Sequence, residues 1–154
     1  MLNQELYDKY DMPGKQALMR VLTHYGYTLV GDINQEHYKE TDLITQDRNG
    51  NQVKWEIQVR TQDNYNKLRN NTFKTFFVHT RKNQNQSEWY VVFPEDYKEV
   101  AIISMKHIKE SSIKTVKTKS GTYESFFDVP MKYVNFYKLT ENFETINCKL
   151  LESI

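Results

Sequence analysis

The sequence predicts an α+β domain in which a mixed central β-sheet is flanked by helices. Three observations support this class. An amphipathic helix comes early in the chain, two strands joined by a tight turn follow it, and later segments rich in aromatic and β-branched residues alternate with shorter helical pieces. With 154 residues, of which 38% are hydrophobic, the chain can form one real core, so we expect a single domain over residues 1–154.

The first helix is predicted over residues 13–25. Asp11 and Pro13 are typical of a helix start, and Gly26 is a stop signal. Apolar residues recur one helical turn apart between these signals and define a single buried face: Leu18, Val21, Leu22 and Tyr25.

The remaining elements follow from local composition. An extended segment is expected at 27–33 and a second helix at 62–71, which carries Tyr65 and Leu68. Further elements are expected as strands at 75–81, 88–93 and 98–105, a short helix near 106–111, a hairpin at 113–129 that turns at Ser120 and Gly121, and a last strand at 132–139.

Residues 40–61 predict a β-hairpin whose register depends on the turn at Asn49 and Gly50. A two-residue loop would pair Leu43 with Glu56 and mix apolar with charged side chains. A three-residue loop over 48–50, with Gly50 in the left-handed conformation, separates them. This register gives Leu43–Trp55 and Thr45–Val53 on an apolar face, and Asp42–Glu56, Ile44–Lys54 and Glu40–Gln58 on a polar face.

The polar face of this hairpin indicates a metal and phosphate site. Two carboxylates directly opposite on neighbouring strands, Asp42 and Glu56, repel each other unless a positive charge lies between them. Mg²⁺ is the simplest such charge, because it prefers oxygen ligands, takes one or two carboxylates, and fills its other positions with water and phosphate oxygens.

Asp42, followed after thirteen residues by Glu56-Ile57-Gln58, resembles the motif of the PD-(D/E)xK nuclease superfamily. The resemblance covers residues 13–94, with a helix before the hairpin and another after it. Gln58 stands at the lysine position of that motif, and Thr41 replaces its usual proline.

The resemblance implies a restriction-endonuclease-like core with additional C-terminal strands, and a metal-dependent endonuclease acting on DNA. In that reading Asp42 and Glu56 bind Mg²⁺ or Mn²⁺, the Ile57 carbonyl is a further ligand, and the protein is a homo-oligomer such as a homodimer. Gln58 has no proton to exchange near neutral pH, so its catalytic role would be to orient the attacking water.

Basic residues near strand ends are the candidates for nucleic-acid binding. Each also has a purely structural explanation: a lysine at a strand end is often solvated, and lysines protect exposed edge strands from pairing with other chains. The candidates are Lys54, His79, Arg81, Lys82, Lys117 and Lys119.

Two other classes of function compete with the nuclease. One is a catalytically inactive nucleic-acid-binding domain of the same fold, and the other is a protein-interaction module of an unrelated α+β fold. In the structural alternative, Lys54 and Arg60 simply neutralise Asp42 and Glu56 as exposed ion pairs. DNA is the expected partner, RNA is not excluded, and resolvase, restriction and homing types stay unresolved.

Overall fold

Two β-sheets and a few short helices make up the computed structural model, which describes residues 7–33, 41–70, 75–80 and 85–145. The larger sheet has the strand order β1-β2-β3-β5-β6-β9, and the smaller has the order β4-β8-β7. The strands of the larger sheet are β1 (Thr28–Leu29), β2 (Leu43–Gln46), β3 (Gln52–Arg60), β5 (Trp89–Pro94), β6 (Glu99–Ser104) and β9 (Asn135–Lys138). Those of the smaller are β4 (Thr75–His79), β7 (Ser112–Lys117) and β8 (Tyr123–Pro130).

The larger sheet is mixed, as expected. Strands β3 and β5 pair in parallel, whereas every other pair in this sheet is antiparallel. Parallel neighbours need a crossover connection, and helix α3 (Gln62–Arg69) lies in the connection from β3 to β5. The α+β class with a mixed sheet is therefore confirmed.

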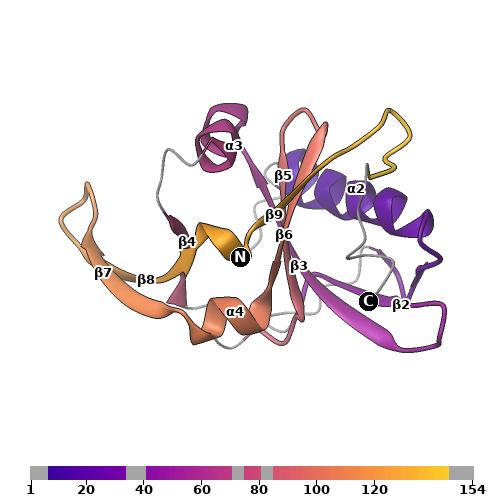
Figure 1. Cartoon of the computed structure of the whole chain (residues 1–154), viewed down its shortest axis with the longest axis horizontal. Coiled ribbons are helices and arrows are strands. Elements are labelled where there is room, and N and C mark those ends of the chain that lie inside the picture. Colours follow the sequence, from indigo (N-terminus) through magenta and orange to yellow (C-terminus); the bar gives the residue numbers. More distant parts are fainter. Residues whose placement is uncertain (1–6, 34–40, 71–74, 81–84, 146–154) are drawn as a thin grey trace.

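The sheet is covered on both faces (Figure 1). A π-helical turn η1 (Tyr7–Asp11) leads into helix α2 (Met12–Thr23), which packs on one face. Helix α3, helix α4 (Met105–Glu110) and the small sheet pack on the other face, and a 3-10 turn η3 (Met131–Tyr133) precedes β9. The β7–β8 hairpin projects from the left end of the molecule in Figure 1.

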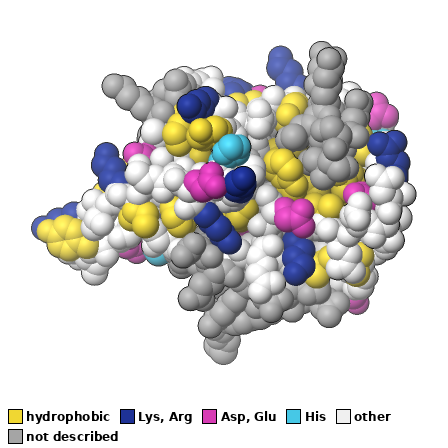
Figure 2. Space-filling view, turned by 60° about the horizontal axis from the view of Figure 1, so that its bottom comes forward, with side chains coloured by type: hydrophobic (Ala, Val, Ile, Leu, Met, Phe, Trp, Pro, Cys, Tyr) yellow, Lys and Arg dark blue, Asp and Glu magenta, His cyan; other side chains and the backbone are white. Residues whose placement is uncertain are grey.

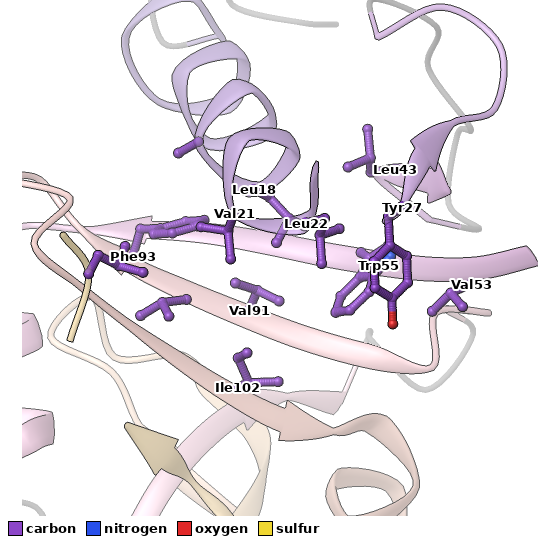
Figure 3. Close-up of a cluster of buried hydrophobic side chains, with 13 residues drawn as sticks. Leu18, Val21, Leu22, Tyr27, Leu43, Val53, Trp55, Val91, Phe93 and Ile102 are labelled. Atoms are coloured by element: carbon purple, nitrogen blue, oxygen red, sulfur yellow. The ribbon is translucent and has the colours of Figure 1, made fainter. Parts of the chain in front are cut away.

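Each face of the larger sheet has its own apolar core. The first core joins Leu18, Val21 and Leu22 of α2 to β3, β5 and β6 (Figure 3). The second core joins Tyr65 and Leu68 of α3 to β4, β5, β6, β8 and α4. The predicted apolar faces of both helices are therefore the faces that they bury.

Strand β3 divides its side chains between these two faces. Trp55, Ile57 and Val59 face α2, and the helix comes so close at Gly14 that an added Cβ would lie 3.1 Å from Val59 Cγ2. Trp55 is fully buried, and its indole nitrogen donates a hydrogen bond to the Thr45 hydroxyl at 2.9 Å. Because side chains alternate along a strand, Glu56, Gln58 and Arg60 face the other way.

The predicted hairpin register is confirmed over residues 43–46. Leu43 pairs with Trp55 and Thr45 with Val53, and the three-residue loop has Gly50 at a φ of 85°. The Asp47 carboxylate stabilises the loop by accepting hydrogen bonds from the backbone N–H groups of residues 49 and 51, both at 2.9 Å. The predicted hairpin around Gly121 (φ 87°) and the predicted short helix near 106–111 are also present.

The division into two sheets was not predicted. The segment 75–79 pairs with β8 in the small sheet and not with the strands of the larger sheet. The pair expected between Glu40 and Gln58 lies outside the described residues. In the described parts of the chain, no helix combines the length and the apolar character needed to cross a membrane.

Replacing Gly50 tests the turn that sets the register. Gly50→Ala should lower the free energy of unfolding by about 1 kcal/mol, because a Cβ disfavours a positive φ. The nearest atom to that Cβ would be Gln46 Nε2 at 3.5 Å, an ordinary contact, so backbone strain accounts for the whole cost. Gly50→Asn is the matched control and should cost less, since asparagine tolerates the left-handed conformation. Equal urea midpoints for the wild type and both variants would contradict the left-handed conformation of Gly50 in this turn.

Candidate functional site

Asp42 is held against the backbone of β3. Its Oδ2 accepts a hydrogen bond from the Ile57 N–H at 2.9 Å, and its own N–H donates to the Trp55 carbonyl at 3.0 Å. The second bond is one residue out of the hairpin register, and the β2–β3 ladder starts at Leu43, so the expected pairing of Asp42 with Glu56 was wrong. The Asp42 carboxylate instead lies beside the middle residue of the Glu56–Gln58 triplet.

Thr41 fixes the chain just before Asp42. Its hydroxyl donates to the Trp55 carbonyl at 2.9 Å and is also hydrogen-bonded to the Ser87 hydroxyl. Proline, the usual residue of the motif at this position, has no hydroxyl for these bonds. Thr41 therefore has a structural role, since it ties the entry of β2 both to β3 and to the segment before β5.

Glu56 is buried, with 4% of its surface exposed. Its Oε2 accepts a hydrogen bond from the side-chain amide of Asn85, which is 6% exposed. Asn85 is fixed in turn, because its Oδ1 accepts from the Ser87 N–H at 2.8 Å and its carbonyl accepts from Lys109 Nζ at 2.6 Å. A buried carboxylate needs such donors to offset the loss of water, so this cluster stabilises Glu56 where it lies.

The Ile57 carbonyl faces the same side as Asp42. In a strand, the N–H and C=O of one residue point toward the same neighbour, and the Ile57 N–H is bonded to Asp42. Asp42, Glu56 and the Ile57 carbonyl are hard oxygen donors of the type that Mg²⁺ and Mn²⁺ accept, and Mg²⁺ commonly takes only one or two carboxylates from a protein. The donor set fits a divalent cation in chemical type. The described residues contain no cluster of three or more His, Cys, Asp or Glu side chains suited to a metal ion.

Gln58 belongs to a hollow at the end of β3. The hollow has a volume of about 290 Å³ and is lined by Gln58, Arg60, Thr61 and Asn64; we call it the Arg60 hollow. Arg60 Nε donates to Gln58 Oε1 at 3.0 Å, and Arg60 Nη1 donates to Asn64 Oδ1 at 3.1 Å. The guanidinium carbon lies 4.4 Å from the centre of the Phe76 ring.

Burial sets the electrostatics of the Arg60 hollow. Loss of water lowers the pKa of the Arg60 guanidinium below its usual value, and the nearby Tyr90 acts in the opposite direction. Arginine nevertheless stays protonated in proteins. The hollow therefore presents one positive charge beside the Gln58 amide.

Lys54 is placed on the expected face, but its partner was not anticipated. Lys54 Nζ donates to Gln86 Oε1 at 3.3 Å. Within the described residues, neither Lys54 nor Arg60 forms an ion pair with Asp42 or Glu56. The structural alternative, in which exposed ion pairs neutralise the two carboxylates, was wrong for this part of the chain.

Of the other candidate nucleic-acid residues, those that the structure describes belong to the small sheet and its β7–β8 turn. His79 packs edge-on against Phe126, with ring centroids 5.3 Å apart. Lys117 ends β7 and Lys119 is in the turn beyond it, both exposed, so they gather at the end of the projecting hairpin, at the left of Figure 1. Arg81 and Lys82 lie outside the described residues.

One face of the molecule shows mixed charge. On the face drawn in Figure 2, dark blue Lys and Arg side chains alternate with magenta Asp and Glu side chains over the described atoms. This agrees with the net charge of +1. A polyanion approaching this face would meet individual cations between acidic side chains.

Sequence reasoning missed Asn85, Lys109 and Asn64. No sequence signal locates Asn85, because the strand directly after α3 is β4, which joins the small sheet, and the parallel neighbour of β3 is the next strand, β5. Asn64 had a signal, because the helix that begins at Gln62 brings its first turn close to Arg60. No local pattern indicates Lys109, which reaches Asn85 from α4.

Comparisons with protein-family models, with curated protein sequences and with solved structures find no match to this chain.

Substitution of Asn85 tests the environment of Glu56. Asn85→Ala should lower the free energy of unfolding by about 1–3 kcal/mol, because Glu56 loses a donor. Asn85→Asp should cost more, about 3 kcal/mol or above, since it keeps the acceptor for the Ser87 N–H but places a second carboxylate against a buried one. Urea unfolding at pH 7 measures both variants. If Asn85→Asp were as stable as Asn85→Ala or more stable, the hydrogen bond from Asn85 to a buried Glu56 carboxylate would be contradicted.

Proposed function

We propose that this chain is a metal-dependent endonuclease that hydrolyses phosphodiester bonds in DNA, with Asp42 and Glu56 as metal ligands. The observation that carries the proposal is the hydrogen bond from the Ile57 N–H to Asp42 Oδ2, which holds the first carboxylate beside the residue that follows the second. Asp42 directly precedes β2, and Glu56–Gln58 lies in the neighbouring strand β3. Helix α2 precedes this hairpin and α3 follows it, as the resemblance to the PD-(D/E)xK superfamily implies.

The residues divide the chemistry between them. Bound by Asp42, Glu56 and the Ile57 carbonyl, Mg²⁺ or Mn²⁺ would supply the charge that activates water and stabilises the transition state. Gln58 has one amide oxygen engaged by Arg60 Nε, so its NH₂ group is the end that can orient a water or a phosphate oxygen. Arg60 contributes the permanent positive charge that the motif usually takes from lysine.

The same proposal includes the setting in which the enzyme works. Cutting both strands of a duplex needs two active sites, which favours a homo-oligomer. We place this oligomer in the cytoplasm, in contact with DNA, and the choice among resolvase, restriction and homing types follows from the substrates tested below.

A nucleic-acid-binding domain without hydrolytic activity is the second candidate. The burial of Glu56 favours it, because the Asn85 amide already satisfies part of that carboxylate from within the protein. The absence of lysine from the triplet also favours it. In this case the protein would bind nucleic acid equally well in EDTA and in Mg²⁺ and would leave it intact.

Nuclease assays with single variants test the first candidate. Plasmid, linear duplex, single-stranded DNA and a four-way junction are incubated with the protein in Mg²⁺ or Mn²⁺, with EDTA as control. Asp42→Ala and Glu56→Gln should each reduce cleavage by about 10²-fold or more, because each removes a ligand of the ion that stabilises the transition state. Gln58→Ala should cost less, about tenfold, since it removes one positioning hydrogen bond.

The order of these effects is the evidence. Thermal melting of each variant separates loss of activity from loss of fold, which matters most for the buried Glu56. Cleavage that persists undiminished in Asp42→Ala would assign the activity to another site or a contaminant. DNA binding without cleavage by the wild-type protein would replace the nuclease with the second candidate.

A further inference from the structure

Among the described residues, the lining of the Arg60 hollow contains one cation and no acidic side chain. Its lining consists of two amides, one hydroxyl and one guanidinium, from Gln58, Asn64, Thr61 and Arg60. None of the described acidic residues forms an ion pair with Arg60. A partly buried charge without a counter-ion is costly, so an anion in the hollow would stabilise this arrangement.

Arg60 is held in place for such a contact. Its guanidinium packs against the Phe76 ring and is bonded at Nε by Gln58 and at Nη1 by Asn64. These two bonds use two of the five N–H donors of the group. Within the described residues the other donors, including both on Nη2, have no hydrogen-bond acceptor, and they form the part of the planar fork that binds phosphate oxygens.

The neutral residues around Arg60 suit an oxyanion as well. Gln58 accepts the Nε hydrogen bond through Oε1, and Asn64 accepts the Nη1 hydrogen bond through Oδ1. With both oxygens directed at Arg60, each amide has an NH₂ group on its other side, and an NH₂ group is a donor. The hollow therefore offers donors from three side chains to one ligand.

We propose that the Arg60 hollow is a phosphate-binding site, with Arg60 as the main ligand and Asn64 as a second donor. In the proposed endonuclease, on which this identification of the phosphate source depends, the bound group is a backbone phosphate of the DNA. Gln58 lines the hollow and ends the Glu56–Gln58 triplet, so the phosphate held here is close in sequence along the DNA strand to the bond that is cut.

Inorganic phosphate tests the site independently of DNA and of catalysis. The Arg60 Nε–Hε resonance, assigned by its loss in Arg60→Lys, is followed by NMR during a phosphate titration at constant ionic strength. We expect a saturable shift for Arg60 and none for Arg69, whose guanidinium is already paired with Glu99. Equal or non-saturating shifts of both resonances would overturn the proposal.

Binding to DNA tests the source of the phosphate. Fluorescence anisotropy with a labelled duplex in EDTA, at several KCl concentrations, compares wild type with Arg60→Gln, Asn64→Ala and Lys67→Gln. Arg60→Gln should weaken binding about tenfold and reduce the slope of log affinity against log salt by about one. Asn64 is exposed, so Asn64→Ala should preserve the fold. It should weaken DNA binding by a smaller factor than Arg60→Gln does.

Lys67→Gln is the matched control. Lys67 is exposed on α3 and pairs with Asp63 at 3.1 Å, so the variant removes one positive charge near the hollow without entering it and should change affinity less than twofold. A phosphate shift at Arg60 with no effect of Arg60→Gln on DNA binding supports the site but assigns it to a free phosphate or a phosphorylated small molecule. If Arg60→Gln and Lys67→Gln weakened DNA binding equally, Arg60 would contribute only as one of several surface charges, and the proposal would be overturned.

Discussion

The alternation of side chains along β3 is the constraint on which the rest of this structure depends. Trp55 is fully buried against α2 and hydrogen-bonded to Thr45. A slip of one residue would expose the indole, which costs about 2–3 kcal/mol in lost apolar burial, and would direct Glu56 into the apolar core beneath α2. The polar row of Glu56, Gln58 and Arg60 is thus fixed by the hydrophobic residues on the opposite face of the strand.

This constraint explains how much the sequence could predict. Apolar periodicity and the chemistry of Gly50 are local, so helix positions, the turn and the register of residues 43–46 were all accessible. Three things were not: the departure of Asp42 from the register, the placement of β4 in a second sheet, and the Asn85 partner of Glu56. The last two depend on contacts between segments distant in sequence, and the first on irregular bonds at the open end of the hairpin; neither leaves a periodic signal.

The polar row contains two environments that differ in their need for a ligand. Glu56 is enclosed, and the protein itself supplies a donor from Asn85. Arg60 lies four residues further along β3, borders the Arg60 hollow, and among the described residues is hydrogen-bonded by the neutral acceptors Gln58 and Asn64. Along one face of β3, a carboxylate bonded by a protein amide and a guanidinium bonded only by neutral acceptors among the described residues therefore lie within five residues of each other. The bonded Glu56 stabilises the fold, whereas the charge of Arg60 can still bind a ligand.

The parallel pairing of β3 with β5 has a consequence for the order in which the molecule assembles. Trp55 lies beside Trp89 in that ladder. The intervening chain must therefore close a loop before the contacts between β3 and β5 can stabilise the fold, and such long-range closure slows folding. The β2–β3 hairpin can form early because its turn is local. Asn85 and Phe76 arrive only with the later step, and until then Glu56 remains hydrated and Arg60 has no aromatic ring beneath it. The turn and register of the β2–β3 hairpin are therefore set before the polar contacts of Glu56 and Arg60 with later segments, and those contacts form together with the apolar core that β5 completes.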